Sequence, residues 1–567
     1  MSIASSNATW SRRLVQACIE AGVAHAFLSP GSRNTPLMLA LNRSGIGTTI
    51  VVDERSAGFV ALGYIRSARR PAALVCTSGS APFHYGPAIA EADASSLPLL
   101  VLSADRPARL RACGAMQTSL QGNLFPELLR ARVDLAAPSH GEESLEPIYQ
   151  ALQHLSGAYP GPVNLNVQFD EPLWEVEAEE AFGLTLGNLP AYEPAPRYAQ
   201  AGVVPTDFFS PSRRGLITVG PSAYGAFKHE PDIERVLRDL STQLGWPILS
   251  EFHSGMRCPH ANMLRFPDLS ARLIAKTRPE EAQSILHVGL LPTSKNIQRL
   301  LESAHQVLHL DPRPGRRLPL DENLDTFRAS PACLMDCVPA QSKSQNEDWL
   351  KAWLEIDDQV HSHLENKSWD TLFEPSVARK LFANLESDGS LVVANSMPIR
   401  QTDVWLGWNE TERLTSVARG VSGIDGTLSS AIGISIAQRR PVWVFLGDLA
   451  YLHDANALAL ARQMGIDLRV VVSDNRGGGI FRRLPIAQHP DAFESHFITP
   501  QDRVDLREIA AGYGAQSREV MAYSELQETF DWMRGCEGPT VVVVKTDSVA
   551  DVDEERRIVA ALEEVIR

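Results

Sequence analysis

The sequence predicts an α/β fold built from three doubly wound domains, each with a parallel sheet. Short β-branched runs alternate with helical stretches along the whole chain, which is the pattern of repeated β–α units. Most of these runs are too evenly apolar for half-exposed strands, so we expect helices to cover both faces of each sheet. The expected strands are Ala73–Cys76, Leu99–Ser103, Val163–Val167, Gly215–Val219, Ile285–Val288, Val307–Leu310, Leu391–Ala394, Val442–Leu446, Arg469–Ser473 and Thr540–Val544.

Two stretches are expected to be linkers between these domains. Leu189 to Pro211 is rich in Pro and Ala, and Ala340 to Asp348 is polar throughout. The 567 residues are too many for one core. We therefore predict three domains, over 1–190, 191–345 and 346–567.

Composition limits the function classes. With 44% hydrophobic and 21% charged residues the chain has the composition of a soluble globular protein. No apolar run is long enough to cross a bilayer, and the first residues lack the apolar core of a signal peptide, so we expect a cytoplasmic protein. The net charge of −15 argues against a nucleic-acid partner. Anionic small molecules would need local arginine clusters.

The C-terminal third has polar residues at the ends of two expected strands. Gly447 and Asp448 close the first strand, and Asn475 with the glycines 477–479 closes the next. Ligands of open α/β sheets lie at the carboxyl ends of strands. A carboxylate and an amide there are hard oxygen ligands suited to Mg²⁺, which would bridge a diphosphate, and the glycines let the backbone approach it. Each motif alone is typical of a turn, whereas the pair predicts a metal–diphosphate site.

The N-terminal third places a carboxylate at the end of a strand. Glu54 follows Val51-Val52-Asp53 and begins a helical stretch that carries Ala57, Ala61 and Gly63. A Glu at a helix start is by itself usually a surface residue that suits the helix dipole. The small residues at helical spacing would let this helix pack closely against a neighbour.

Together these motifs resemble the signatures of the thiamine-diphosphate enzyme superfamily. The resemblance implies that 1–190 is a pyrimidine-binding domain, 191–345 a central domain and 346–567 a diphosphate- and metal-binding domain. The resemblance implies that Asp448, the Asn475 side chain and the Gly477 carbonyl bind Mg²⁺, or Mn²⁺. It also implies that Glu54 hydrogen-bonds the aminopyrimidine ring and favours the imino tautomer that removes the thiazolium C2 proton. Ile424 would lie under the cofactor and impose its bent shape. The further cofactor-binding residues implied are Ser80, Gly423, Gly447, Leu449, Gly478 and Ile480.

Several longer strings narrow the resemblance to one branch. They are SPGSRNTPL from Ser29, TSGSA from Thr77, ADRP from Ala104, GAMQT from Gly114, NSMPIR from Asn395 and RGVSGIDGT from Arg419. This set resembles the MenD family, the 2-succinyl-5-enolpyruvyl-6-hydroxy-3-cyclohexene-1-carboxylate synthases of menaquinone or phylloquinone biosynthesis. The similarity covers nearly the whole chain and is thin only in the middle third. Leu449 replaces the small residue of many thiamine enzymes and fits this branch, whereas His84 stands where Asn is expected.

The resemblance implies a transferase reaction and the residues that serve it. Thiamine diphosphate would decarboxylate 2-oxoglutarate, and the succinyl carbanion equivalent would add to isochorismate in a 1,4-addition. Both substrates are dicarboxylates, which arginine is well built to bind. The implied substrate-binding residues are Ser32, Arg33, Arg106, Gln117, Lys295, Ser396, Arg400, Arg419 and Phe481. The superfamily further implies a homodimer with shared active sites, or a tetramer.

Two other functions, and one other cofactor, fit parts of the sequence less well. Another thiamine-dependent 2-oxo-acid enzyme, such as an acetolactate synthase or a decarboxylase, would act on smaller and less anionic substrates, leaving the arginines without a purpose. An inactive cofactor-binding scaffold could lose Glu54, Asp448 and Asn475, yet all three are present. Some relatives bind a flavin in the middle third, but no Gly-rich fingerprint follows a strand there.

Overall fold

A computed structural model describes most of the chain. The described residues are 2–566 except 157–158, 183–203, 206, 222–232, 279–280, 312–317, 321–324, 330–333, 335–344, 388, 410–413, 417 and 500–503. Most of the two predicted linkers lies outside them, so the domain boundaries remain predictions. The chain divides into two compact units: unit 1 comprises residues 1–197 and 420–440, and unit 2 comprises residues 198–419 and 441–567.

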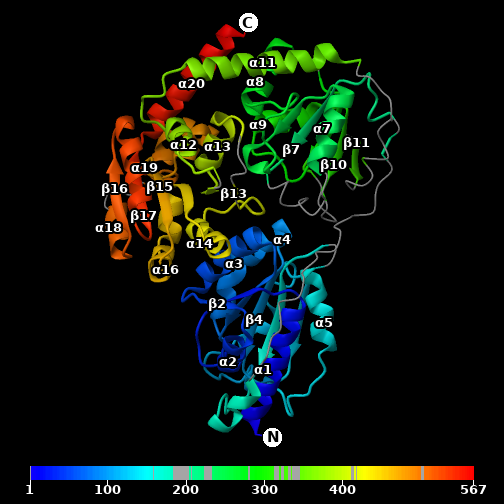
Figure 1. Ribbon diagram of the computed structural model, residues 1–567, viewed down its shortest axis with the longest axis vertical. Coiled ribbons are helices and arrows are strands. Elements are labelled where there is room, and N and C mark those ends of the chain that lie inside the picture. The colour runs from blue at the N-terminus through cyan, green and yellow to red at the C-terminus, as the bar shows by residue number, and fades with distance from the viewer. Residues whose placement is uncertain are drawn as a thin grey trace. The chain divides into compact units, whose positions relative to one another are not determined.

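Three parallel sheets with flanking helices make up the fold, which confirms the predicted class (Figure 1). The first sheet lies in unit 1 and the other two lie in unit 2. In sheet order the strands are β2 (Gly47–Ile50), β1 (His25–Leu28), β3 (Ala72–Cys76), β4 (Leu99–Asp105), β6 (Val163–Gln168) and β5 (Ala131–Leu135); then β11 (Asp325–Ala329), β10 (Gln306–Leu310), β9 (Ser284–Val288), β7 (Gly215–Val219) and β8 (Ile248–Ser250); then β13 (Leu414–Ser416), β12 (Ser390–Val393), β14 (Val442–Gly447), β15 (Leu468–Asp474), β17 (Thr540–Lys545) and β16 (Gln516–Val520).

Every expected strand is confirmed to within two residues at each end. The strand expected before Glu54 is β2, which ends at Ile50. Helices fill the connections, as parallel strands require. Those of unit 1 are α1 (Ile3–Glu20), α2 (Thr35–Ser44), α3 (Glu54–Ala68), α4 (Gly86–Ser95), α5 (Glu146–Leu152) and α14 (Thr427–Gln438). Those of unit 2 are α7 (Ile233–Leu244), α8 (Pro267–Thr277), α9 (Lys295–Ser303), α11 (Glu347–Asn366), α12 (Glu374–Ala383), α13 (Met397–Trp405), α15 (Asp448–Asp454), α16 (Ala457–Met464), α17 (Pro490–His496), α18 (Leu506–Gly512), α19 (Leu526–Gly535) and α20 (Ser548–Val565).

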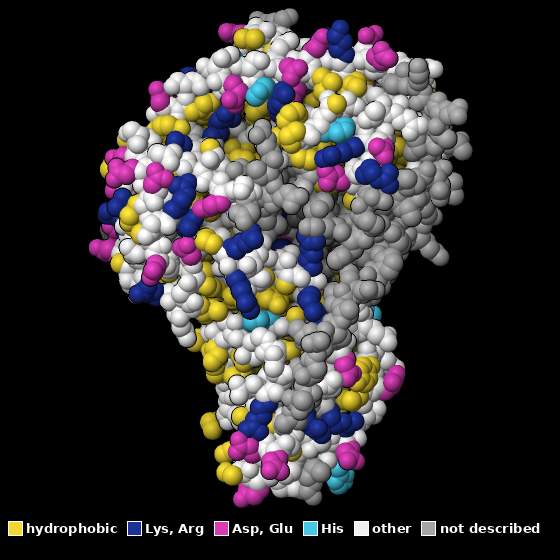
Figure 2. Space-filling view, viewed as in Figure 1, with side chains coloured by type: hydrophobic (Ala, Val, Ile, Leu, Met, Phe, Trp, Pro, Cys, Tyr) yellow, Lys and Arg dark blue, Asp and Glu magenta, His cyan; other side chains and the backbone are white. Residues whose placement is uncertain are grey.

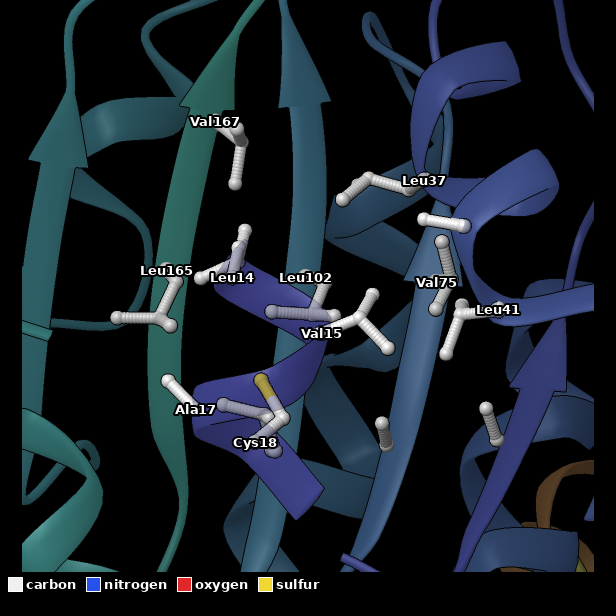
Figure 3. Close-up of a cluster of buried hydrophobic side chains, with 14 of the residues drawn as sticks. Leu14, Val15, Ala17, Cys18, Leu37, Leu41, Val75, Leu102, Leu165 and Val167 are labelled. Carbon is white, nitrogen blue, oxygen red and sulfur yellow. The ribbon is translucent and has the colours of Figure 1, made fainter. Parts of the chain in front are cut away.

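The core of unit 1 lies between the first sheet and the helices on its face. Helix α1 begins where the Ser2 hydroxyl accepts a hydrogen bond from the Ser5 N–H. Its buried side chains then contact aliphatic residues of β3, β4 and β6, and α2 adds two leucines (Figure 3). Burying each large aliphatic side chain contributes roughly 1.5–3 kcal/mol. The side chains labelled in Figure 3 are Leu14, Val15, Ala17, Cys18, Leu37, Leu41, Val75, Leu102, Leu165 and Val167.

Helices α3 and α14 cross in close contact inside unit 1. A Cβ on Gly63 would lie 1.9 Å from the carbonyl oxygen of Ser430, and a Cβ on Gly433 would lie 1.9 Å from that of Val60. The two backbones therefore touch where neither helix has a side chain. This confirms the close packing expected from the small residues of α3. The contact also ties the segment before β14 to the helix that begins at Glu54.

Charged side chains of both signs lie on the surface, as the composition leads one to expect. Basic and acidic side chains are interspersed on the visible face of each unit (Figure 2). None of the helices in the described part of the chain is long and apolar enough to cross a membrane.

We predict that Gly63→Ala destabilises unit 1. The added methyl group must push α3 and α14 apart, and overpacking of this kind costs about 1–3 kcal/mol. Thermal unfolding followed by circular dichroism should show a lower midpoint. Gly535→Ala is the matched control, because a Cβ on Gly535 meets nothing within 4 Å. Equal midpoints for the two variants would contradict the close contact.

Candidate active site

The three predicted metal ligands lie at one edge of the third sheet. Strands β14 and β15 pair in parallel with Gly447 opposite Ser473, so the residues that follow both strands meet at the carboxyl edge. Asp448 begins α15 and is buried. Its Oδ1 accepts a hydrogen bond from the Leu449 N–H at 2.7 Å, and its Oδ2 accepts one from the Gly477 N–H at 2.6 Å. The bond from Gly477 joins the two strand ends.

The Asp448 carboxylate lies in a setting that suits a cation. Burial, with a smaller contribution from the neighbouring Asp474, raises its pKa to about 7. Asp474, which no sequence motif singles out, accepts a hydrogen bond from the Lys545 ammonium at 2.6 Å. No group of three or more His, Cys, Asp or Glu among the described residues is placed to hold a metal. A metal at this edge would therefore depend on one carboxylate together with amide and carbonyl oxygens.

Asn475 and the glycines after it complete this edge. The Asn475 Nδ2 donates to the Glu374 Oε1 at 2.7 Å. Gly477 and Gly478 have φ of 85° and 78°, a left-handed conformation that glycine adopts without strain. A Cβ on Gly477 would lie 2.1 Å from the Thr499 carbonyl oxygen, so a larger residue does not fit there. Carboxylate, amide and backbone carbonyl oxygens are the ligands that a hard divalent cation prefers.

A cavity of about 560 Å³ in unit 2 brings together two of the predicted substrate residues. Arg400 from α13 and Lys295 from the start of α9 both line it, and Arg483 lies in the same wall. Burial and the charge of Arg419 lower the pKa of Arg400. Ser396, just before α13, has φ of 73°, which is strained for a residue with a side chain. The cavity lies between the elements of the second and third sheets.

The second sheet holds α13 in place. The fully buried Arg257 guanidinium donates to the Asp403 carboxylate at 2.9 Å and to the Leu406 carbonyl at 3.0 Å. The ring of His253 lies 2.6 Å from the Thr402 hydroxyl. Buried ion pairs of this kind are costly to break from one side. Helix α13, which carries Arg400, is therefore fixed by residues from the middle third, where recognisable motifs are few.

Two further predicted residues of unit 2 are placed near strand ends. The Arg419 Nη1 donates to Asn395 Oδ1 at 3.0 Å, just after β12. Phe481 packs edge-on against Phe497, with ring centroids 5.4 Å apart. Ile480 lies in the same short 3₁₀ turn as Phe481, directly after Gly478 and Gly479.

In unit 1, Glu54 is the first residue of α3 and is half-buried. The Asp53 side chain caps the helix by accepting from the N–H groups of Arg55 and Ser56. The charge of Glu54 contributes to raising the pKa of the buried Cys76 and Tyr85, chiefly an effect of their burial. The Glu54 carboxylate thus lies near buried side chains, in surroundings of low dielectric constant.

A second group in unit 1 contains Arg33, Arg106 and Gln117. The Arg106 Nη1 donates to the Ser78 Oγ at 2.6 Å and to the Gln117 carbonyl at 2.8 Å, and nearby Arg33 helps burial to lower the pKa of Arg106. Arg33 itself is buried and donates to the Phe169 carbonyl and the Glu171 carboxylate. Both contacts of Arg33 hold it in place beside Arg106. Ser32 and Ser80 are exposed.

The loop that carries Gly423 and Ile424 is held by a residue that the sequence analysis missed. The buried Glu91 carboxylate of α4 accepts from the Gly420 N–H at 3.1 Å and the Val421 N–H at 2.9 Å. It also accepts from the Arg66 guanidinium at 2.5 Å. These contacts all lie in unit 1. A local sequence pattern could not reveal them, because Glu91 and Val421 are 330 positions apart.

The structure thus gathers the predicted residues in two groups, one in each unit. Unit 1 contains Ser32, Arg33, Glu54, Ser80, Arg106, Gln117, Gly423 and Ile424, and unit 2 contains Lys295, Ser396, Arg400, Arg419, Gly447, Asp448, Leu449, Asn475, Gly477, Gly478, Ile480 and Phe481. The predicted metal ligands and the predicted substrate residue Arg400 lie in one unit, and Glu54, the predicted catalytic carboxylate, lies in the other.

Comparison with known families agrees with this arrangement of three sheets. The model for "Thiamine pyrophosphate enzyme, N-terminal TPP binding domain" matches residues 8–125. The model for "Middle domain of thiamine pyrophosphate" matches residues 208–393, and that for "Thiamine pyrophosphate enzyme, C-terminal TPP binding domain" matches residues 401–544. Fold and site therefore define a thiamine pyrophosphate enzyme.

Full-length relatives narrow the class. A 2-succinyl-5-enolpyruvyl-6-hydroxy-3-cyclohexene-1-carboxylate synthase of Synechococcus sp. (strain RCC307) is 35% identical over 94% of this chain and 93% of its own length. Synthases of the same name from Listeria monocytogenes serotype 4b (strain F2365) and Rubrobacter xylanophilus are 33% and 34% identical, over 94% and 95% of this chain and 93% and 96% of their own lengths. The chain belongs to this synthase family.

The buried Glu251 generates a prediction of pH dependence. It follows β8 and accepts from the Ser294 N–H at 3.0 Å, and burial together with Asp403 raises its pKa to about 8. The folded protein then keeps a proton that the unfolded chain loses above an ordinary carboxyl pKa of about 4. The contribution of Glu251 to stability should therefore fall as the pH rises from about 4 to about 8.

Glu251→Gln should flatten this part of the stability profile. Chemical unfolding at pH 5, 6, 7 and 8 would measure the slope in the variant and in the parent chain. The exposed Glu508→Gln serves as the control and should keep the parent slope. An unchanged slope in Glu251→Gln would contradict the raised pKa.

Proposed function

We propose that this protein is a thiamine-diphosphate- and Mg²⁺-dependent transferase that decarboxylates 2-oxoglutarate and adds the remaining four-carbon unit to isochorismate. The product would be 2-succinyl-5-enolpyruvyl-6-hydroxy-3-cyclohexene-1-carboxylate, in menaquinone or phylloquinone biosynthesis. The observation that carries the proposal is the paired strand ends of Asp448 and Asn475 in a chain that matches synthases over about 94% of its length.

The cofactor would be held at its diphosphate end and at its aminopyrimidine end. Bound thiamine diphosphate supplies the electron sink that decarboxylation of a 2-oxo acid requires. Asp448, Asn475 and the Gly477 carbonyl would bind Mg²⁺, or Mn²⁺, and through it the diphosphate. Glu54 would accept or share a proton at the aminopyrimidine ring. Ser80, Gly423, Ile424, Gly447, Leu449, Gly478 and Ile480 would contact the cofactor.

The arginines would bind the carboxylates of the substrates. Arg400 and Lys295 line one cavity and place two cations there, which suits a dicarboxylate. Arg106 and Arg419 would contribute from their own groups. Ser32, Gln117, Ser396 and Phe481 would orient the substrates. Arg33, engaged by Glu171, would act through Arg106 or on a substrate that displaces that contact.

The direct test is substrate consumption. Purified protein with thiamine diphosphate and Mg²⁺ should consume 2-oxoglutarate and isochorismate together and release carbon dioxide. Turnover of pyruvate alone would instead support an acetolactate-synthase-like enzyme. Cofactor binding with no turnover of either kind would support an inactive scaffold.

Glu54→Gln should abolish activation while sparing cofactor binding. The variant keeps the shape of the side chain but loses the charge that favours the imino tautomer, so turnover should fall by at least about 10²-fold. Calorimetry with thiamine diphosphate should show near-parental affinity. Asp448→Ala is the comparison, since it should lose Mg²⁺-dependent cofactor binding. Near-normal turnover in Glu54→Gln would remove Glu54 from the mechanism.

Arg400→Ala should weaken the handling of anionic substrates. Loss of a buried carboxylate contact costs about 2–5 kcal/mol, so kcat/KM for 2-oxoglutarate or isochorismate should fall by at least about thirtyfold. The exposed Arg299→Ala of α9 is the control. Normal kinetics in Arg400→Ala, with the control equally normal, would show that Arg400 only lines the cavity.

We further propose a homodimer, or a tetramer of such dimers, in which Glu54 of one chain and Asp448 of the other serve one site. The division of the predicted residues between two units supports this. So do the exposed apolar side chains near the site of unit 1: Val52 is 82% exposed, Met116 87% and Leu120 79%. A C₂ interface would cover such side chains twice.

Complementation tests the shared site. Glu54→Ala and Asp448→Ala chains should each be inactive alone, whereas a mixed dimer contains one site with both residues intact. Co-expression should therefore restore part of the activity. Mixed dimers isolated with two affinity tags that remain inactive would place each site within one chain.

A further inference from the structure

Glu374 is a buried carboxylate to which no role has been given so far. It is the first residue of α12, and its side chain is only 3% exposed. Both of its oxygens accept hydrogen bonds. The Oε1 accepts from Asn475 Nδ2 at 2.7 Å and from the Ser473 hydroxyl at 3.2 Å, and the Oε2 accepts from Gln401 Nε2 at 2.9 Å. One side chain therefore contacts three elements of unit 2.

The contact with Asn475 decides which way its amide faces. An amide has a donor end and an acceptor end, whereas a carboxylate only accepts. The Nδ2 must therefore face Glu374, and Oδ1 is turned away from it. The Gly479 N–H approaches Oδ1 at 3.4 Å, which is long for a hydrogen bond, so Oδ1 retains its capacity to accept. This is the oxygen that a metal would bind.

The other oxygen of Glu374 leads to the substrate side. Gln401 follows Arg400 in α13, and its Nε2 donates to Glu374 Oε2 and to Glu555 Oε1, each at 2.9 Å. Both hydrogens of the Gln401 amide are thus used. Glu555 in turn accepts from Arg483 at 2.7 Å, a residue that lines the same cavity as Arg400. A continuous chain of hydrogen bonds, buried at Glu374 and Gln401 and half-buried at Glu555 and Arg483, joins Asn475 to the wall of that cavity.

We propose that Glu374 is a positioning residue for the metal and for α13. Through Asn475 it aims the amide oxygen at Mg²⁺, and through Gln401 it sets the helix of Arg400 against the metal cradle. Its own contacts are with protein side chains, so it would act through Asn475 and Gln401. The inference deepens the proposed function and rests on its metal site. Mutation of a residue that orients a metal ligand in this way typically weakens metal affinity by about 10–100-fold.

Glu374→Gln is the primary variant. Its amide cannot accept from Asn475 and Gln401 at once, because one end now donates, so a donor faces a donor or Asn475 turns over. Free Mn²⁺ measured by electron paramagnetic resonance, with thiamine diphosphate present, should show affinity weaker by about 10–100-fold. Thermal unfolding without metal should stay close to that of the parent. Parental Mn²⁺ affinity would overturn the proposal.

Gln401→Met separates the two links. It removes the bond to Oε2 at similar size and leaves Asn475 bonded to Oε1. Mn²⁺ affinity should change less than about twofold, whereas KM for 2-oxoglutarate should rise because α13 loses its tie. A loss of Mn²⁺ affinity as large as that of Glu374→Gln would indicate general loosening of the region and would also overturn the proposal.

The double variant Glu374→Gln with Asn475→Asp tests the orientation itself. The Gln amide can donate to one Asp oxygen and leave the other facing the metal. We expect this pair to bind Mn²⁺ more tightly than Glu374→Gln alone, by at least about tenfold. Losses that simply add would mean that the two residues act independently, against the proposal.

Asp448→Ala keeps this inference distinguishable from the metal site on which it rests. Loss of Mn²⁺ by Asp448→Ala with parental binding in Glu374→Gln would overturn only the role of Glu374. Retention of Mn²⁺ by Asp448→Ala would overturn the metal site and the inference with it.

Discussion

The parallel register of β14 and β15 is the constraint on which the site depends. Because Gly447 lies opposite Ser473, the first residues after both strands reach the same sheet edge. Asp448, Asp474 and Asn475 are brought together by this single pairing. A shift by one residue would reverse the faces of a whole strand and separate them. The flanking valines of β15 and β17 are fully buried, which makes such a shift costly.

Polar groups at this edge are buried at considerable cost, and backbone and amide donors offset that cost. Asp448 accepts from two backbone N–H groups, and Asp474 has the Lys545 ammonium. Burial is the main cause of the raised pKa of Asp448, and the neighbouring Asp474 adds to it. A cation bound beside Asp448 would favour its ionised form.

The sequence was sufficient for the central strands and failed chiefly at the sheet edges. Apolar runs covered on both faces are visible in one dimension, and every strand expected from them is present. Of the strands not expected, only β1 lies inside its sheet; β5, β8, β11, β13 and β16 are edge strands. Strands β5 and β16 alternate between more and less exposed positions, so apolarity alone does not distinguish them from loops. Strand β8 is buried but only three residues long, too short to form a clear apolar run.

The site residues likewise divide into those that a local sequence pattern indicates and those that it does not. Asp448 and Asn475 could be predicted because each closes a recognisable strand. Glu374 and Glu91 could not, since their contacts with Asn475 and Val421 span 101 and 330 positions and follow no local pattern. Arg33 shows the opposite limit: its motif indicates a substrate residue, whereas tertiary contacts engage it with Glu171. Which residues support a site is thus a property of the packed fold.

The middle third illustrates how a segment with few recognisable motifs can still shape a site. It contributes Lys295 directly, but its larger effect is on α13. Arg257 forms an ion pair with Asp403 of that helix, and His253 is hydrogen-bonded to Thr402. Glu374 accepts a hydrogen bond from Gln401 of the same helix. Arg400 directly precedes these three residues of α13 in the sequence. All three are buried, so their contacts fix the backbone of α13 and with it the point from which the Arg400 side chain extends.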